Sequence, residues 1–93
     1  MNSIKKQNDE LVSQLEKYID TFNTEAFHKK IGELVNQISQ FSAEQKEAFK
    51  NEVLPALRKM FDSIMEQLEE QNNMEKSKDL ERQLKEIEDM VDV

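Results

Sequence analysis

The sequence predicts an all-α protein folded as an antiparallel bundle of three to four helices, and three observations support this. The 93 residues include one Gly and one Pro, too few turn-forming residues for an all-β sandwich or barrel. Apolar residues recur at intervals of three and four along four segments, which is the spacing of one helix face. The chain has no Cys, which excludes disulfides, thiolate metal ligands and thiol catalysis.

The first two predicted helices span about residues 3–22 and 25–40. Ser3 is a candidate N-cap of the first helix, and Asn23 or Thr24 can cap the second. The apolar stripe of the first segment comprises Ile4, Leu11, Leu15, Tyr18, Ile19 and Phe22. The stripe of the second comprises Phe27, Ile31, Leu34, Val35, Ile38 and Phe41. Each stripe is wide enough to face two neighbouring helices.

The third predicted helix spans about residues 43–71 and has the widest apolar face, which makes it the expected centre of the core. Ser42 and Gln45 have the spacing of a capping box, in which each side chain accepts a hydrogen bond from the other residue's amide. Pro55 lies inside this helix and predicts a kink, because its nitrogen cannot donate to the preceding turn. Residues 1–71 are therefore expected to form the bundle.

Residues 72–93 follow a polar interruption and form a narrower apolar seam. Either the chain turns near Asn72 and Asn73, or one long helix continues with a shift in the phase of its apolar residues. The seam consists of Leu80, Leu84, Ile87 and Val91. Its 3–4 spacing resembles that of a coiled coil, and it is too narrow to serve an internal core. We therefore expect a C-terminal amphipathic helix that acts as an assembly or partner-binding element. The bundle closes either within one chain or by pairing of two helical hairpins from two chains. Because the C-terminal seam needs a surface to lie against, we expect a homodimer or another obligate partner.

The net charge of −7 is unevenly distributed, since residues 42–93 account for all but −1 of it. The predicted acidic surface comprises Glu66, Glu69, Glu70, Glu86, Glu88, Asp89 and Asp92. Such a field repels nucleic acid and anionic lipid, so direct binding to either is not expected. The expected partner is a protein with a basic rim or an amphipathic helix.

The sequence offers little for catalysis or cofactor binding. Glu25 and His28 have the Glu-x-x-His spacing of di-iron bundles, but such a site requires two of these motifs and the chain contains one. No nucleophile motif, glycine-rich phosphate loop or calcium loop occurs. No apolar run approaches the ~20 residues that span a bilayer. We expect a cytoplasmic protein that is not an enzyme and has no catalytic residue, metal or cofactor.

These observations favour a small helical protein–protein interaction module, such as an adaptor, a chaperone-like subunit or a regulator. The predicted partner-binding residues are Leu57, Phe61, Ile64, Met65, Leu68, Leu80, Leu84, Ile87 and Val91. The alternative is an acidic inhibitor or nucleic-acid mimic that occupies a basic site on its target. Salt distinguishes the two, because a mimic loses its partner steeply as ionic strength rises. A third class, a structural homo-oligomer, differs in lacking a foreign partner.

Overall fold

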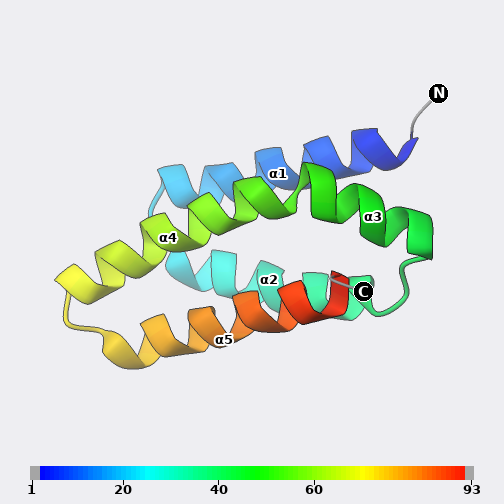
Figure 1. Cartoon of the computed structure of the whole chain (residues 1–93). Helices are drawn as coiled ribbons and strands as arrows, with labels where there is room; N and C mark the ends of the chain where they lie inside the picture. Colours follow the sequence, from blue (N-terminus) through cyan, green and yellow to red (C-terminus); the bar gives the residue numbers. More distant parts are fainter. Residues whose placement is uncertain (1–2, 92–93) are drawn as a thin grey trace.

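The computed structural model describes residues 3–91, which form five α-helices and no strand (Figure 1). The helices are α1 Ser3–Asp20, α2 Thr24–Ile38, α3 Ala43–Glu52, α4 Leu54–Glu70 and α5 Met74–Val91. The all-helical class is thereby confirmed. Within this range, no helix has both the length and the apolar character needed to cross a membrane.

Two antiparallel hairpins, α1–α2 and α4–α5, lie side by side, and α3 connects them (Figure 1). Helix α1 packs beside α4, and α2 packs beside α5. The molecule measures 44 × 25 × 19 Å along its principal axes, so it has two distinct ends. The α1–α2 and α4–α5 turns lie at one end, while the α2–α3 connection and the end of α5 lie at the other (Figure 1).

Local hydrogen bonds define the starts of two helices. The predicted capping box is confirmed, because the amide of Ser42 donates to Gln45 Oε1 at 2.8 Å and the amide of Gln45 donates to Ser42 Oγ at 3.1 Å. Asn23 caps α2 by accepting a hydrogen bond from the amide of Ala26 at 3.2 Å. Of the two residues that the sequence offered as caps for this helix, Asn23 is thus the one used.

The third predicted helix is two helices, and this is why the described helices exceed the predicted number. Helix α3 ends at Glu52 and α4 begins at Leu54, with Pro55 in its first turn. Proline fits the start of a helix because the amides of the first turn have no partner inside the helix. Val53 lies at the junction, and its amide still donates to the carbonyl of Phe49 at 2.8 Å. The predicted interruption near Pro55 is correct, but it separates two helices instead of kinking one.

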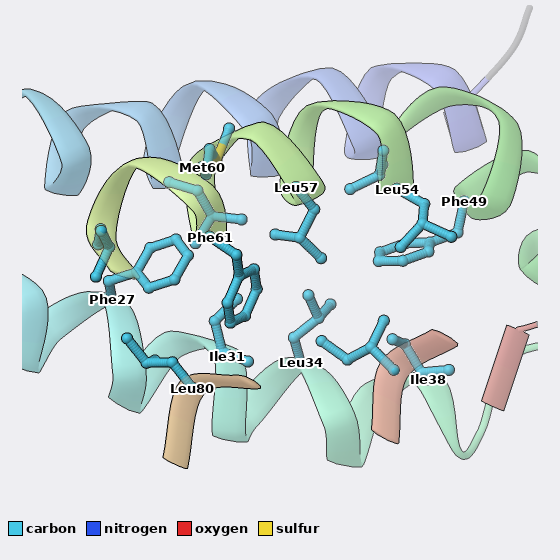
Figure 2. Packing of buried hydrophobic residues seen from close by; sticks show 14 of the residues in the cluster. Phe27, Ile31, Leu34, Ile38, Phe49, Leu54, Leu57, Met60, Phe61 and Leu80 are labelled. Atoms are coloured by element: carbon cyan, nitrogen blue, oxygen red, sulfur yellow. The ribbon is translucent and has the colours of Figure 1, made fainter. Parts of the chain in front are cut away.

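The core lies between α2, α4 and α5, with contributions from α1 and α3. Phe27 of α2 and Phe61 of α4 face each other across it, with ring centroids 5.1 Å apart in an edge-to-face arrangement (Figure 2). Phe49 of α3 packs against Phe41 at 6.0 Å. The buried apolar residues are Leu15, Phe27, Ile31, Leu34, Ile38, Phe49, Val53, Leu54, Leu57, Met60, Phe61, Ile64, Leu68, Leu80, Ile87 and Val91.

The start of the fourth predicted helix matches one of the two alternatives that the sequence left open, a turn near Asn72 and Asn73. The chain turns at Gln71 and Asn72, so α4 and α5 are separate helices and no continuous helix runs past residues 72–73. Asp92 and the last residue of the predicted range 72–93 lie outside the described residues. Helix α5 folds back along α4 and α2, and this position buries its apolar seam in the core of the same chain.

Candidate interaction surface

The apolar seam of α5 lies inside the core of its own chain. Leu80 and Ile87 are 0% exposed, Val91 is 2% exposed, and Leu84 is partly buried against them. The prediction that the seam is too narrow for an internal core is therefore wrong. Its contact face is wider than its apolar stripe, because the buried Ser77 and other partly buried polar side chains extend it on both sides. A count of apolar residues alone misses this width.

The predicted partner-binding residues of α4 are also buried. Leu57 and Phe61 are 0% exposed, Ile64 is 2% and Leu68 is 4% exposed, while Met65 is partly buried. These side chains lie in or against the buried cluster to which α2 and α5 of the same chain also contribute, and α4 packs along α5. The folded chain therefore does not present this face as a groove for a partner.

The predicted acidic surface divides into two groups at opposite ends of the molecule. Glu66, Glu69 and Glu70 are exposed near the end of α4, whereas Glu86 and Asp89 are exposed near the end of α5. In the second group, Glu88 is partly buried, and its Oε2 lies 2.7 Å from Arg58 Nη2. Asp92 lies outside the described residues. The acidic residues thus form two separate patches.

Glu25 and His28, which have the Glu-x-x-His spacing of a metal site, each interact with a residue of α5. His28 Nδ1 lies 2.9 Å from Gln83 Oε1, and Gln83 Nε2 donates to the backbone carbonyl of His28 at 3.4 Å, which joins α2 to α5. The Glu25 side chain is 88% exposed and lies 3.9 Å from Lys76 Nζ. Among residues 3–91, no three His, Cys, Asp or Glu side chains are grouped in a way that could hold a metal ion.

The turn that connects α1 to α2 is defined by two backbone hydrogen bonds. The amide of Asn23 donates to the carbonyl of Tyr18 at 2.8 Å, and the amide of Phe22 donates to the carbonyl of Ile19 at 3.1 Å. This pair of bonds is the Schellman motif, which satisfies free carbonyls at a helix C-terminus and places one residue in the left-handed conformation. That residue is Phe22, with φ 56°.

The turn between α4 and α5 has the same hydrogen bonds. The amides of Asn73 and Asn72 donate to the carbonyls of Leu68 and Glu69, at 2.8 and 3.0 Å. Here the left-handed residue is Asn72, with φ 60°. Asparagine tolerates this conformation, whereas a bulky residue is disfavoured in it by about 1–2 kcal/mol. At the left-handed position, the α1–α2 turn has a phenylalanine, whereas the α4–α5 turn has an asparagine, which tolerates this conformation.

Phe22 is also exposed to solvent, which its place in the predicted apolar stripe did not indicate. It is 67% exposed, and Met74 at the start of α5 is 51% exposed. These two are the exposed large apolar side chains of the described residues. Both lie at the end of the molecule that holds the two turns (Figure 1). The prediction that Phe22 continues the core-facing stripe is therefore wrong, because α1 ends before it at Asp20.

A shallow hollow separates Phe22 from the last turn of α4. Its volume is about 430 Å³, and its lining comprises Phe22, Thr24, Gln67, Leu68, Glu70 and Gln71. We call the surface formed by residues 20–25 and 66–76 the turn-end surface. The ion pair of Glu25 with Lys76 joins its two segments across the bundle.

The turn-end surface is strongly acidic. Residues 20–25 contain Asp20 and Glu25, and residues 66–76 contain four Glu and one Lys. These two segments thus have a net charge of −5, out of −7 for the whole chain. The surface combines exposed apolar side chains with most of the net charge of the protein.

A second hollow, of about 530 Å³, lies between α1, α2 and the start of α3. Five glutamines contribute to its lining, namely Gln7, Gln14, Gln37, Gln40 and Gln45. It contains neither Phe22 nor Met74. Its lining offers amide hydrogen bonds but no exposed large apolar side chain, so the turn-end surface is the better candidate for an interaction.

Comparison with known proteins adds no family to this description, since no family model, no curated protein and no solved structure matches the chain. The candidate surface therefore rests on the geometry of this chain alone. Sequence reasoning missed Phe22 because it continues the spacing of the first apolar stripe, and it missed Met74 because that residue lies in the polar interruption between two stripes. The signal that could have identified Phe22 is the similarity of its turn to the Asn72 turn, since an asparagine follows both residues.

Exchange of the two left-handed residues tests the strain at Phe22. Phe22→Asn is expected to leave the free energy of unfolding unchanged or to raise it by up to about 1 kcal/mol, because relief of the backbone offsets the loss of a mostly exposed ring. Asn72→Phe is the matched control and is expected to lower it by about 1 kcal/mol. Urea unfolding followed by circular dichroism measures both. A clear loss of stability in Phe22→Asn would show that the ring serves the fold.

Proposed function

We propose that the chain is a small, non-enzymatic protein–protein interaction module that binds its partner through the turn-end surface. The observation that carries this proposal is Phe22, a bulky residue in the left-handed conformation with 67% of its surface exposed. The fold gains little from such a residue, and local strain of this kind occurs preferentially at functional sites. Aromatic side chains are frequent anchors of protein interfaces.

This proposal keeps the function class that the sequence suggested but changes the surface. The seam of α5 and the apolar face of α4 are enclosed in the core, so a partner could reach them only if the bundle opened. Phe22 and Met74 are accessible in the folded chain. The module acts in this proposal as an adaptor or a regulatory subunit. A homodimer stays a prediction, but the buried seam no longer supports it.

Site-specific photo-crosslinking in the cells that make the protein tests this function. We expect a photoreactive amino acid in place of Met74 to give a discrete crosslinked protein adduct, and Phe22→Asn in the same chain to remove it. The control is the same photoreactive residue in place of Glu44, an exposed position in the first turn of α3 at the other end of the molecule. Equal adducts at both positions, or none at position 74, would contradict the proposal.

The acidic character of the turn-end surface also favours the alternative, an inhibitor or nucleic-acid mimic that occupies a basic site. Its net charge of −5 supports a role for electrostatic attraction. The two acidic patches, however, lie at opposite ends of a molecule 44 Å long, so they form no continuous row of charges. Salt dependence of the captured complex distinguishes the two proposals, because an apolar anchor holds its partner at an ionic strength that releases a mimic.

A further inference from the structure

Phe22 is an energetically unfavourable feature of the turn-end surface, because its ring is exposed and its backbone is left-handed. The end of α4 contains a second unfavourable feature. Its last turn contains Glu69 and Glu70 and no basic residue. The C-terminus of a helix carries a partial negative charge, so carboxylates there are unfavourable and cations are favourable. Both side chains are exposed, and neither forms an ion pair with any residue of the part of the chain that the structure describes.

These two unfavourable features lie next to each other. Phe22 and Glu70 line the same hollow at the turn-end surface. One would be relieved by apolar atoms that cover the exposed ring. The other would be relieved by positive charge at the end of α4. A single occupant with both properties would cover the ring of Phe22 and pair with the carboxylate of Glu70. In the free chain the ring is exposed and the carboxylate has no ion pair with the described residues.

We propose that the turn-end surface binds a cationic amphipathic helix of another protein, an inference that rests on the proposed function. The apolar face of that helix covers Phe22 and Met74, and its Lys or Arg side chains lie against Glu69 and Glu70. The two shorter dimensions of the molecule are 25 and 19 Å. At a rise of 1.5 Å per residue, a helix of about 13–17 residues covers this end.

Charge argues against the other occupants. A second copy of the chain would bring the same net charge of −5 to the contact, and like charges oppose that pairing. Nucleic acid and anionic lipid are repelled in the same way. An apolar helix without cations would leave the carboxylates of Glu69 and Glu70 close to an apolar surface without partners.

The test uses the full chain and a synthetic 16-residue helical peptide of Leu, Ala and Lys with one face apolar. Fluorescence anisotropy of the labelled peptide measures its dissociation constant at three salt concentrations, and amide chemical shifts of the protein locate the site. We expect the shifts to concentrate in residues 20–25 and 66–76. A peptide with every Lys replaced by Glu serves as the control and is expected not to bind.

Matched variants separate specific binding from general attraction to an acidic protein. Glu69→Gln/Glu70→Gln removes two charges near the end of α4, and Glu86→Gln/Asp89→Asn removes two exposed charges near the end of α5. We expect the first pair to weaken binding about tenfold and the second by less than about threefold. Phe22→Asn is expected to weaken it about tenfold as well, and this tenfold difference from the unchanged protein should persist at each salt concentration because the variant keeps all the carboxylates.

Several outcomes would overturn this inference. Equal losses in the two charge variants would show general attraction, and equal binding of the Glu peptide would exclude charge recognition. A dimer of the chain alone, measured by light scattering and dissociated by Phe22→Asn, would make the occupant a second copy. If the crosslink at position 74 forms while the Lys peptide fails to bind, the chemistry proposed for the partner is wrong and the proposed function stands.

Discussion

Removal of α5 is expected to unfold the rest of the chain. A chain that ends at Asn73 loses Leu80, Ile87 and Val91, each of them 0–2% exposed in the folded protein. Full burial of such a side chain contributes about 1.5–3 kcal/mol, so the loss of the three is about 4.5–9 kcal/mol before the newly exposed faces of α2 and α4 are counted. Small proteins are stable by about 5–15 kcal/mol in total. Helicity per residue, measured by circular dichroism, should therefore collapse in the shortened chain.

The control for this truncation is the addition of residues 74–93 as a separate peptide. If α5 completes the core, the peptide restores helicity to the shortened chain in a concentration-dependent way. A shortened chain that keeps its helicity and unfolds cooperatively would contradict this expectation. In that case the first four helices would close a core of their own, and α5 would be a detachable element.

Phe61→Ala is expected to have the next largest effect, a loss of about 3–5 kcal/mol in the free energy of unfolding. Phe61 is 0% exposed, and its ring meets that of Phe27 at 5.1 Å in an edge-to-face arrangement. Removal of the ring leaves a cavity between α2 and α4, and the aromatic pair is lost with it. Urea unfolding at 25 °C measures the change.

Phe41→Ala is the matched control for this substitution. Phe41 also pairs with another ring, that of Phe49 at 6.0 Å, but it is partly exposed and lies in the connection between α2 and α3. We expect it to lower the free energy of unfolding by about half as much, since less apolar surface is lost from the interior. Similar losses in both variants would show that the Phe27–Phe61 pair is not central to the core.

The signals that predicted the helices act over a few residues. The capping box of Ser42 and Gln45 forms as expected because both of its hydrogen bonds connect residues three apart. Pro55 interrupts the helix because its nitrogen carries no hydrogen, whatever the tertiary context. Such features follow from the identity of neighbouring residues, and the sequence states them directly.

The candidate surface was much harder to predict than the helices. The sequence assigned Leu80 and Ile87 to a partner and Phe22 to the core, and the structure reverses both assignments. Helical spacing specifies which side chains share a face but does not specify what that face meets. In α5 it meets α2 and α4, while Phe22 lies past the end of α1 in a turn.

The sequence by itself determined that this protein is helical, where most of its helices begin, and that its charge is negative. Only the tertiary structure decided which apolar residues are enclosed and that Phe22, Met74 and the carboxylates of α4 meet at one end. The physical reason is that helix formation depends on hydrogen bonds between near neighbours. Burial and the approach of distant charges depend instead on how two hairpins lie against each other, and that is a property of the whole bundle.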